Sequence, residues 1–338
     1  MKKIGLLLAL LGALAACAVP ADEATAALAP GRDARLTLYT SHKQAVYGPI
    51  VKEFQEETGI WVEVITGGTN ELLERIAAEA ERPVCDVMFG GGVESLCAYE
   101  SCFEPYACAG ADRLREGLRP EGDAWTPFSS LPLVFIYNPK LVEPDQLTGW
   151  ADLIDPRWKG KIAFADPTVS GSSYTAALTL LSCLPGDDWE LLEQFAANLD
   201  GDILADSGDV VGAVANGSRY LGVTLEETAL KGLGQGAEIA VFLPAEGTSA
   251  VPDGSALVAG APHAENAKAF LEFVQSRDVQ ELVVSQFSRR SVRTDVHDPD
   301  SLPPVEELDV IDYDVHWAAG LKEEFTARWL ALCGEERA

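Results

Sequence analysis

Residues 36–65 read LTLYTSHKQAVYGPIVKEFQEETGIWVEVI, in which two short apolar runs flank one amphipathic segment. The runs Leu36–Tyr39 and Ile60–Ile65 predict strands. Between them, residues 46–57 predict a helix that ends at Gly59, with four apolar residues on one face: Val46, Ile50, Val51 and Phe54. A strand, a helix and a second strand in this order predict a parallel pair with a right-handed crossover.

The same alternation continues along the chain and predicts an α/β fold class. Gly67-Gly68-Thr69 precedes a helix over Asn70–Ala80, and a strand over Asp86–Phe89 leads into Gly90-Gly91-Gly92 and another helix. Beyond the Pro-containing stretch 127–132, further strands are predicted over Val134–Tyr137, Ile162–Phe164, Tyr220–Val223, Glu238–Phe242 and Ala256–Ala259. Further helices are predicted over Ser173–Leu181, Trp189–Asn198, Asp209–Asn216, Glu265–Gln275, Val279–Phe287 and Val315–Leu332.

The predicted elements divide into two α/β lobes joined by extended segments. We assign residues 36–130 plus 251–298 to the first lobe and residues 131–250 plus 299–338 to the second. Two such lobes predict a cleft between them, and ligands of open α/β sheets bind at the carboxyl ends of the strands. The Gly- and Ser-rich loops at these ends are therefore the candidate binding residues.

Composition excludes several classes of function. The chain has 338 residues, with 25 Lys and Arg against 53 Asp and Glu, so its formal net charge is −28. At 47% hydrophobic residues it can bury large cores. A nucleic-acid binder needs a basic surface to displace counterions, and a polybasic membrane-surface protein needs one as well. The charge argues against both.

The first residues predict an export signal. Lys2 and Lys3 precede an apolar run over residues 4–16 that is too short to span a bilayer, which is typical of a cleaved signal peptide. Leu14-Ala15-Ala16-Cys17 resembles the bacterial lipobox, which implies that residues 1–16 are removed and that Cys17 carries lipid. An ordinary signal peptide with an incidental cysteine is the alternative. Residues 17–35 are then a flexible tether, and the mature protein is extracytoplasmic and anchored to the membrane.

Six cysteines remain after Cys17, namely Cys85, Cys97, Cys102, Cys108, Cys183 and Cys333. An exported chain permits disulfides and an even number is consistent with pairing, although six thiols are an open alternative. The chain has no Cys-x-x-Cys, which argues against a zinc ribbon or a thioredoxin-like centre.

Motifs of catalysis and of metal binding are missing from the sequence. The four histidines, His42, His263, His297 and His316, are scattered, and there is no Walker A motif, Gly-x-Ser-x-Gly elbow or Ser-x-x-Lys. The sequence therefore supports neither an enzyme nor a resident metal or cofactor, although an extracellular hydrolase is kept as an alternative from another class.

The segment from Asp166 to Tyr174, DPTVSGSSY, lies between a predicted strand and a predicted helix. Backbone N–H groups at a helix start, with serine hydroxyls beside them, bind phosphate, phosphonate or carboxylate. Four residues are therefore candidates for holding an anion: Ser170, Gly171, Ser172 and Ser173. The alternative is that one serine merely caps the helix.

Other candidates follow predicted strands or helix starts around the same cleft. Ser41 and His42 follow the first strand, Gly68-Thr69 and Gly91-Gly92 allow close approach of a ligand to the backbone, and Glu226-Glu227 could accept from an amine or from hydroxyls. Each has a plainer reading, as an ordinary surface histidine, as turn glycines or as solvated acids.

Three segments resemble bacterial extracellular solute-binding proteins of ABC importers. They are Leu36–His42, Phe54–Ile60 and Asp86–Gly92, and Trp150–Leu153, Trp158–Ile162, Asp166-Pro167 and Ala213–Gly217 extend the likeness. The resemblance is to the ferric-iron, phosphonate and sugar-phosphate branch. It implies a type II periplasmic-binding-protein fold, closure of two lobes on a solute, and delivery to a permease and ATPase by a monomer that performs no chemistry.

The resemblance also bears on the ligand. Iron-binding members use adjacent tyrosines just past the strand that corresponds to Tyr220–Val223, but here the stretch reads Thr224-Leu225-Glu226-Glu227-Thr228. We therefore expect a solute with a phosphoryl or phosphonate end and an amine or hydroxyl end, such as an aminoalkyl-phosphonate or a sugar phosphate. Ferric iron is the alternative ligand.

Overall fold

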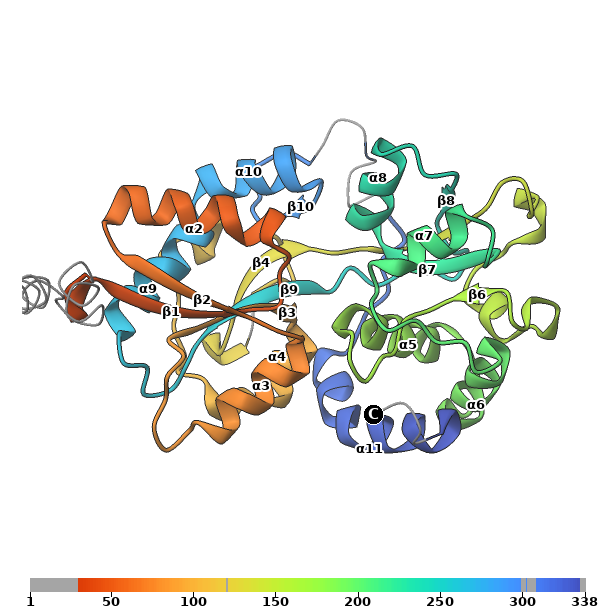
Figure 1. Cartoon of the computed structure of the whole chain (residues 1–338), viewed down its shortest axis with the longest axis horizontal. Helices are drawn as coiled ribbons and strands as arrows, with labels where there is room; N and C mark the ends of the chain where they lie inside the picture. Colours follow the sequence, from red (N-terminus) through yellow and green to blue (C-terminus); the bar gives the residue numbers. More distant parts are fainter. Residues whose placement is uncertain (1–29, 120, 299–301, 303–307, 335–338) are drawn as a thin grey trace, which may run out of the picture.

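The computed structural model describes residues 30–119, 121–298, 302 and 308–334. They form two lobes side by side, each built on one β-sheet with helices packed against it (Figure 1). The predicted signal peptide and Cys17 lie outside the described residues. No helix in the described part of the chain is long and apolar enough to cross a membrane.

The first lobe contains a six-stranded mixed sheet in the order β10-β4-β9-β3-β1-β2. β1 (Arg35–Thr40) pairs in parallel with β2 (Trp61–Thr66) and β3 (Val87–Gly92), as the strand–helix–strand pattern predicts. β9 (Pro252–Leu257) pairs antiparallel with β3, so a strand from much later in the chain completes this sheet. β4 (Thr126–Ser130) and β10 (Arg290–Ser291) extend it.

Helices cover both faces of this sheet. The helices are α2 (Gln44–Thr58), α3 (Thr69–Ala78), α4 (Val93–Ala98), α9 (Ala264–Val274) and α10 (Arg277–Phe287). One core gathers aromatic residues from distant segments, with Phe54, Phe89, Phe128 and Phe270 fully buried. A second core lies against α3 and α4 and contains Leu72, Leu73, Met88 and Leu96. Burial of these side chains fixes the sheet between the two helical layers.

The second lobe has a four-stranded sheet in the order β6-β7-β5-β8. Its strands are β5 (Leu133–Tyr137), β6 (Ile162–Ala163), β7 (Leu221–Leu225) and β8 (Ala240–Phe242). Its helices are α5 (Gly171–Cys183), α6 (Asp188–Leu199), α7 (Asp209–Ala215) and α8 (Glu226–Gly234). Short 3-10 helices occupy Arg32–Ala34, Glu100–Cys102, Ala111–Arg113, Glu121–Asp123, Pro144–Gln146, Trp150–Ile154 and Pro156–Trp158.

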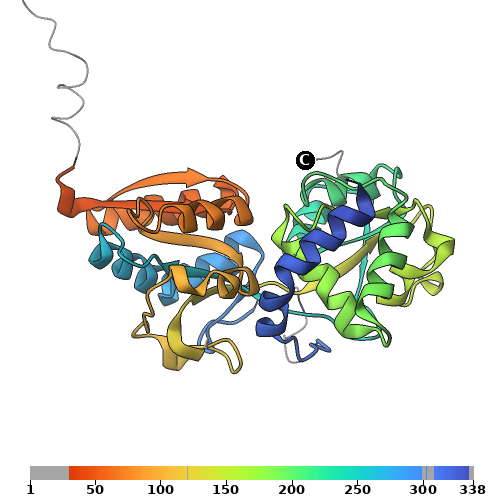
Figure 2. The ribbon, with the colours of Figure 1, turned by 90° about the horizontal axis from the view of Figure 1, so that it is seen from below.

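The last helix, α11 (Val315–Cys333), belongs to both lobes. Phe325 and Trp329 are buried in the core of the second lobe, while α11 also packs against α4 of the first lobe. Figure 2 shows α11 starting at the junction and running along the second lobe. α11 therefore spans the boundary between the lobes.

The observed elements overlap the predicted ones, with three additions. β4 overlaps the Pro-containing stretch 127–132, for which no strand is predicted because it contains Pro127. α8 begins at Glu226, where the sequence predicted only a loop after a strand. β10 is two residues long and has no periodicity to detect. Cys85, Cys97, Cys102, Cys108 and Cys183 form no disulfide in the structure.

Candidate functional site

A cavity of about 570 Å³ opens between the two lobes. Its lining includes the residues that precede the first turns of six helices: Lys43 (α2), Gly68 (α3), Gly92 (α4), Ser170 (α5), Gly208 (α7) and Leu225 (α8). The first N–H groups of a helix have no acceptor within it, and its dipole is positive at this end. Each of these ends adds a partial positive charge beside the cavity, independent of its charged side chains.

The start of α5 forms one wall. Ser170 Oγ accepts the N–H of Ser173 at 3.3 Å and lies 3.1 Å from Ser172 Oγ. Gly171 and Ser172 are the first two helical residues, so their N–H groups have no acceptor within the helix. Ser170 therefore caps the helix, while the N–H groups of Gly171 and Ser172 have no acceptor within it.

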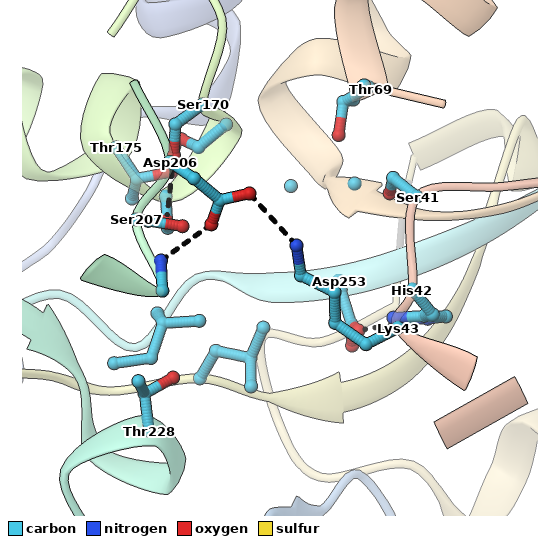
Figure 3. A pocket seen from close by; sticks show the side chains of 18 of the residues that line it. Ser41, His42, Lys43, Thr69, Ser170, Thr175, Asp206, Ser207, Thr228 and Asp253 are labelled. Carbon is cyan, nitrogen blue, oxygen red and sulfur yellow. Dashed lines mark hydrogen bonds and ion pairs between the residues drawn. The ribbon is translucent and has the colours of Figure 1, made fainter. Parts of the chain in front are cut away.

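The facing wall comes from the first lobe and contains Ser41, Thr69, Gly91 and Gly92 (Figure 3). Gly91 has a φ of +101°, and a Cβ at this position would lie 2.6 Å from Thr69 Cγ2. Only glycine satisfies both constraints. The backbone therefore comes close to the space that a ligand would occupy.

Charged side chains line the remaining wall, and they are paired. Arg289 Nη1 donates to Asp253 at 2.7 Å and to Ser129 Oγ at 3.2 Å, while its Nη2 lies 3.5 Å from Glu227. Lys231 lies 2.6 Å from the second oxygen of Glu227. The Nε of Arg289 is buried and has no hydrogen-bond partner among the described residues.

A further ion pair crosses from one lobe to the other beside the cavity. Lys43 Nζ donates to Asp206 Oδ2 at 3.0 Å, and Figure 3 shows the two side chains reaching toward each other. Both are well exposed, at 76% and 52% of their side-chain surface. Such a pair contributes little to stability but places one charge of each sign at the cavity.

His42 is buried behind the charged wall. Its ring packs edge-on to Phe89 at 4.5 Å, and its Nε2 lies 3.4 Å from Asp253. Burial, with the nearby cations Arg289 and Lys231, lowers the pKa of His42 well below its usual value. Burial raises the pKa of Asp253, although Arg289 and Ser129 oppose the shift. His42 is therefore a neutral imidazole at neutral pH.

Most of the predicted binding residues come together in this cavity. Its lining includes Ser41, His42, Gly68, Thr69, Gly91, Gly92, Ser170, Gly171, Ser172 and Glu227. Ser173 and Glu226 do not line it. The N–H of Ser173 is taken up by Ser170, and Glu226 accepts two hydrogen bonds from Arg290, at 2.8 and 3.0 Å.

Sequence reasoning missed the charged lining residues Lys43, Asp206, Lys231, Asp253 and Arg289. Lys43 directly follows Ser41-His42 and could have been included on that ground. Lys231 lies four residues after Glu227 on α8, a helical spacing that could also have pointed to it. Asp206, Asp253 and Arg289 carry no local signal, because tertiary packing alone brings them to the cavity.

The described residues contain no group of three His, Cys, Asp or Glu side chains placed to hold a metal ion. Tyrosine is also absent from the cavity lining among these residues. The cavity offers N–H groups, hydroxyls and three cations, and each of these cations is paired with a lining carboxylate.

Comparisons with known proteins identify the family of this chain. A family model described as bacterial extracellular solute-binding protein matches residues 84–316. Iron uptake protein A1 of Synechocystis sp. is 29% identical over 278 residues, which are 76% of this chain and 76% of that protein. A putative 2-aminoethylphosphonate-binding periplasmic protein of Salmonella typhimurium is 26% identical over 257 residues, covering 72% of this chain and 73% of its own.

Solved structures share the fold. The periplasmic binding protein AfuA of Actinobacillus pleuropneumoniae, with fructose-6-phosphate bound, has a TM-score of 0.80 at 23% identity, covering 88% of this chain and 98% of its own. Iron-bound HitA of Pseudomonas aeruginosa has a TM-score of 0.77 at 21% identity, covering 88% and 99%. The chain belongs to the family of bacterial extracellular solute-binding proteins, which serve ABC importers, and the predicted two-lobed fold is confirmed.

Proposed function

We propose that this protein captures a small solute with a phosphoryl or phosphonate group and delivers it to an ABC permease. The main support is that several helix starts converge on one cavity, with Ser170, Gly171 and Ser172 on one side and Thr69 and Gly92 on the other. Four of these helices, α2, α3, α5 and α8, have nine residues or more. Together their N–H groups favour a compact anion.

The charged wall bears on the other end of the solute. The three lining acids, Asp206, Glu227 and Asp253, are each paired with a lining cation, so this wall is neutral overall. An ammonium group would meet no unpaired carboxylate there. A hydroxyl both donates and accepts, and therefore suits a wall of alternating charges. This supports a sugar phosphate ahead of an aminoalkyl-phosphonate.

Calorimetric titration tests the proposal, with protein purified from cells that express the full chain. The solutes are fructose 6-phosphate, 2-aminoethylphosphonate, inorganic phosphate and ferric citrate, with unphosphorylated fructose as the matched control. We expect fructose 6-phosphate to bind at least tenfold more tightly than 2-aminoethylphosphonate, and fructose not to bind. Absence of binding by every phosphorylated and phosphonate solute overturns the proposal.

Ferric iron is the second candidate, because iron-uptake proteins are among the relatives. Binding of ferric iron in the titration, without any phosphorylated solute binding, would establish this alternative.

The membrane anchor is part of the same proposal, and rests on Leu14-Ala15-Ala16-Cys17. We propose an extracytoplasmic monomer held by lipid on Cys17. Cell fractionation tests it, since Cys17→Ser should move the protein from the membrane to the soluble fraction. A variant that stays with the membrane contradicts lipidation at Cys17.

A further inference from the structure

A buried carboxyl group lies directly behind the cavity wall. Glu94 is the second residue of α4 and is fully buried. A Cβ added to Gly92, which lines the cavity, would lie 2.5 Å from both carboxyl oxygens of Glu94. The carboxyl group is therefore separated from the proposed anion site by little more than the backbone of Gly92.

Glu94 is linked to a second lining residue, Thr175 of α5, in the other lobe. The Thr175 hydroxyl lies 2.5 Å from Glu94 Oε1 and 3.1 Å from the carbonyl oxygen of Gly171. One hydroxyl has one proton, so it cannot donate to both. If Glu94 is a neutral acid it donates to Thr175, and Thr175 then donates to Gly171. With the neutral acid, hydrogen bonds therefore run from Glu94 through Thr175 to the carbonyl of Gly171. With the carboxylate, the Thr175 hydroxyl donates to Glu94 and cannot donate to Gly171.

The surroundings of Glu94 favour the neutral acid. Its Oε2 is buried and has no hydrogen-bond partner among the described residues. Burial raises the pKa of Glu94 above its usual value, although the Thr175 hydrogen bond, the backbone N–H of Glu94 and Lys322 act in the opposite direction. Removal of a carboxylate from water is costly, and burial is the largest influence here.

The other ionisable groups of this cluster come from α3, α4, α5, α11 and the residues before α11. Burial, with Glu100 and Glu94, raises the pKa of Cys97, although a hydrogen bond with Trp125 opposes the shift, so its thiol is neutral. Lys322 donates to Ser95 Oγ at 2.8 Å and lies 4.6 Å from the centre of the Tyr174 ring. Burial lowers the pKa of Lys322 to about 8, opposed by Glu94 and Glu74. The pKa values of Tyr174 and Tyr313 are raised by burial and by Glu94, so both phenols are neutral.

We propose that Glu94 is a positioning residue that couples anion binding in this cavity to a proton, so that the neutral acid favours binding and the carboxylate opposes it. The inference rests on the proposed function. With Glu94 neutral and Lys322 charged, the pair carries one positive charge. It carries none after Glu94 ionises and one negative charge after Lys322 also loses its proton. Anion affinity should therefore fall as pH rises.

The test is a pH series of anion titrations on wild type and Glu94→Gln, with protein purified from cells that express the full chain. The probes are inorganic phosphate and sulfate, and the charge of sulfate is constant between pH 5 and 9. For whichever probe binds, we expect the ratio of the wild-type Kd to the Glu94→Gln Kd to rise at least tenfold between pH 5 and 8. Lys268→Gln, which removes a partly exposed cation outside the cavity lining, should follow wild type.

Two further measurements keep the proposal falsifiable if Glu94→Gln fails to fold. Wild type titrated with the anion in buffers of different ionisation enthalpy should take up a proton on binding. Lys322→Gln should weaken binding about tenfold at pH 7 and remove the component of the pH dependence near pH 8.

The outcomes separate the two proposals. Binding of anions with the same pH dependence in wild type and Glu94→Gln, or without proton uptake in wild type, overturns the role of Glu94 and leaves the proposed function standing. No binding of phosphate, sulfate or fructose 6-phosphate by any variant at any pH overturns the proposed function, and the role of Glu94 with it.

Discussion

Arg290 of β10 forms two hydrogen bonds to Glu226 of α8, at 2.8 and 3.0 Å, and both side chains are buried where the lobes meet. Arg289, which precedes Arg290, and Glu227, which follows Glu226, face each other at 3.5 Å and line the cavity. Two consecutive arginines of one lobe thus meet two consecutive glutamates of the other. One pair joins the lobes, and the other borders the proposed ligand.

The buried pair gives a prediction about stability. Arg290→Met leaves Glu226 as a buried charge without its main partner, so the free energy of unfolding should fall by about 3 kcal/mol. Urea unfolding measures this. The exposed pair of Arg277 and Glu281 is the control, and Arg277→Met should cost less than about 1 kcal/mol. Equal effects of the two substitutions would contradict a structural role for Arg290.

The helix start at Ser170–Ser172 gives a prediction about binding. Ser172→Asp places a negative charge at the first turn of α5, where it competes with an anionic ligand for the same N–H groups. We expect phosphate binding to be lost while the melting temperature stays within a few degrees of wild type. Ser182→Asp, at an exposed position near the other end of α5, should bind normally. Calorimetry decides, and unchanged affinity in Ser172→Asp would remove this helix start from the site.

The ion pair between Lys43 and Asp206 gives a prediction of opposite sign. The hydrogen bond from the N–H of Gly208, and then Lys43, lower the pKa of Asp206, so it is ionised at neutral pH and repels an anion. Asp206→Asn should tighten phosphate binding about threefold, with a change in unfolding free energy below about 1 kcal/mol because the pair is exposed. Asp200→Asn, in the remote exposed pair with Lys159, is the control and should leave the Kd unchanged. Weaker binding by Asp206→Asn would mean that the pair contributes more by holding the lobes together.

His42 gives a prediction about acid stability. The folded protein lowers the pKa of His42, so the unfolded chain binds a proton more readily below about pH 6.5. The free energy of unfolding should therefore decrease as the pH is lowered. This residue contributes up to about 2 kcal/mol of that decrease between pH 7 and pH 5. His42→Gln should lose that part of the pH dependence in urea unfolding, and the exposed His316→Gln should keep it. The same pH dependence of the unfolding free energy in wild type, His42→Gln and His316→Gln would contradict a lowered pKa of His42.

Local patterns were sufficient for much of the fold. The strands and helices from Leu36 to Phe89 follow from hydrophobic periodicity and from glycine at helix ends, which act within about ten residues. The pairing of β9 with β3 and the position of β4 depend on contacts between distant segments, which periodicity does not encode. The role of Pro127 in a strand could not be inferred for the same reason.

The same distinction applies to the site. Ser170–Ser172 were predicted because an anion-binding helix start is a local motif. Glu226 and Glu227 are neighbours in sequence, yet one is buried against Arg290 and the other lines the cavity, since successive helical residues point in different directions. Arg289 follows α10 with no motif around it. Its place in the site depends on its ion pair with Asp253, a contact between segments that are distant in sequence.

The packing of α11 against α4 has a consequence for how the molecule is made. α4 belongs to the early part of the described chain and α11 to its end, and the cavity wall at Gly92 lies next to this contact. During synthesis, the first lobe must therefore wait for the last helix before its side of the junction is covered. A chain that stops short of α11 would leave this face of α4 open to water, including Ser95, which accepts a hydrogen bond from Lys322 of α11. The cavity wall at Gly92 should thus be supported from behind only once the end of the chain has been made.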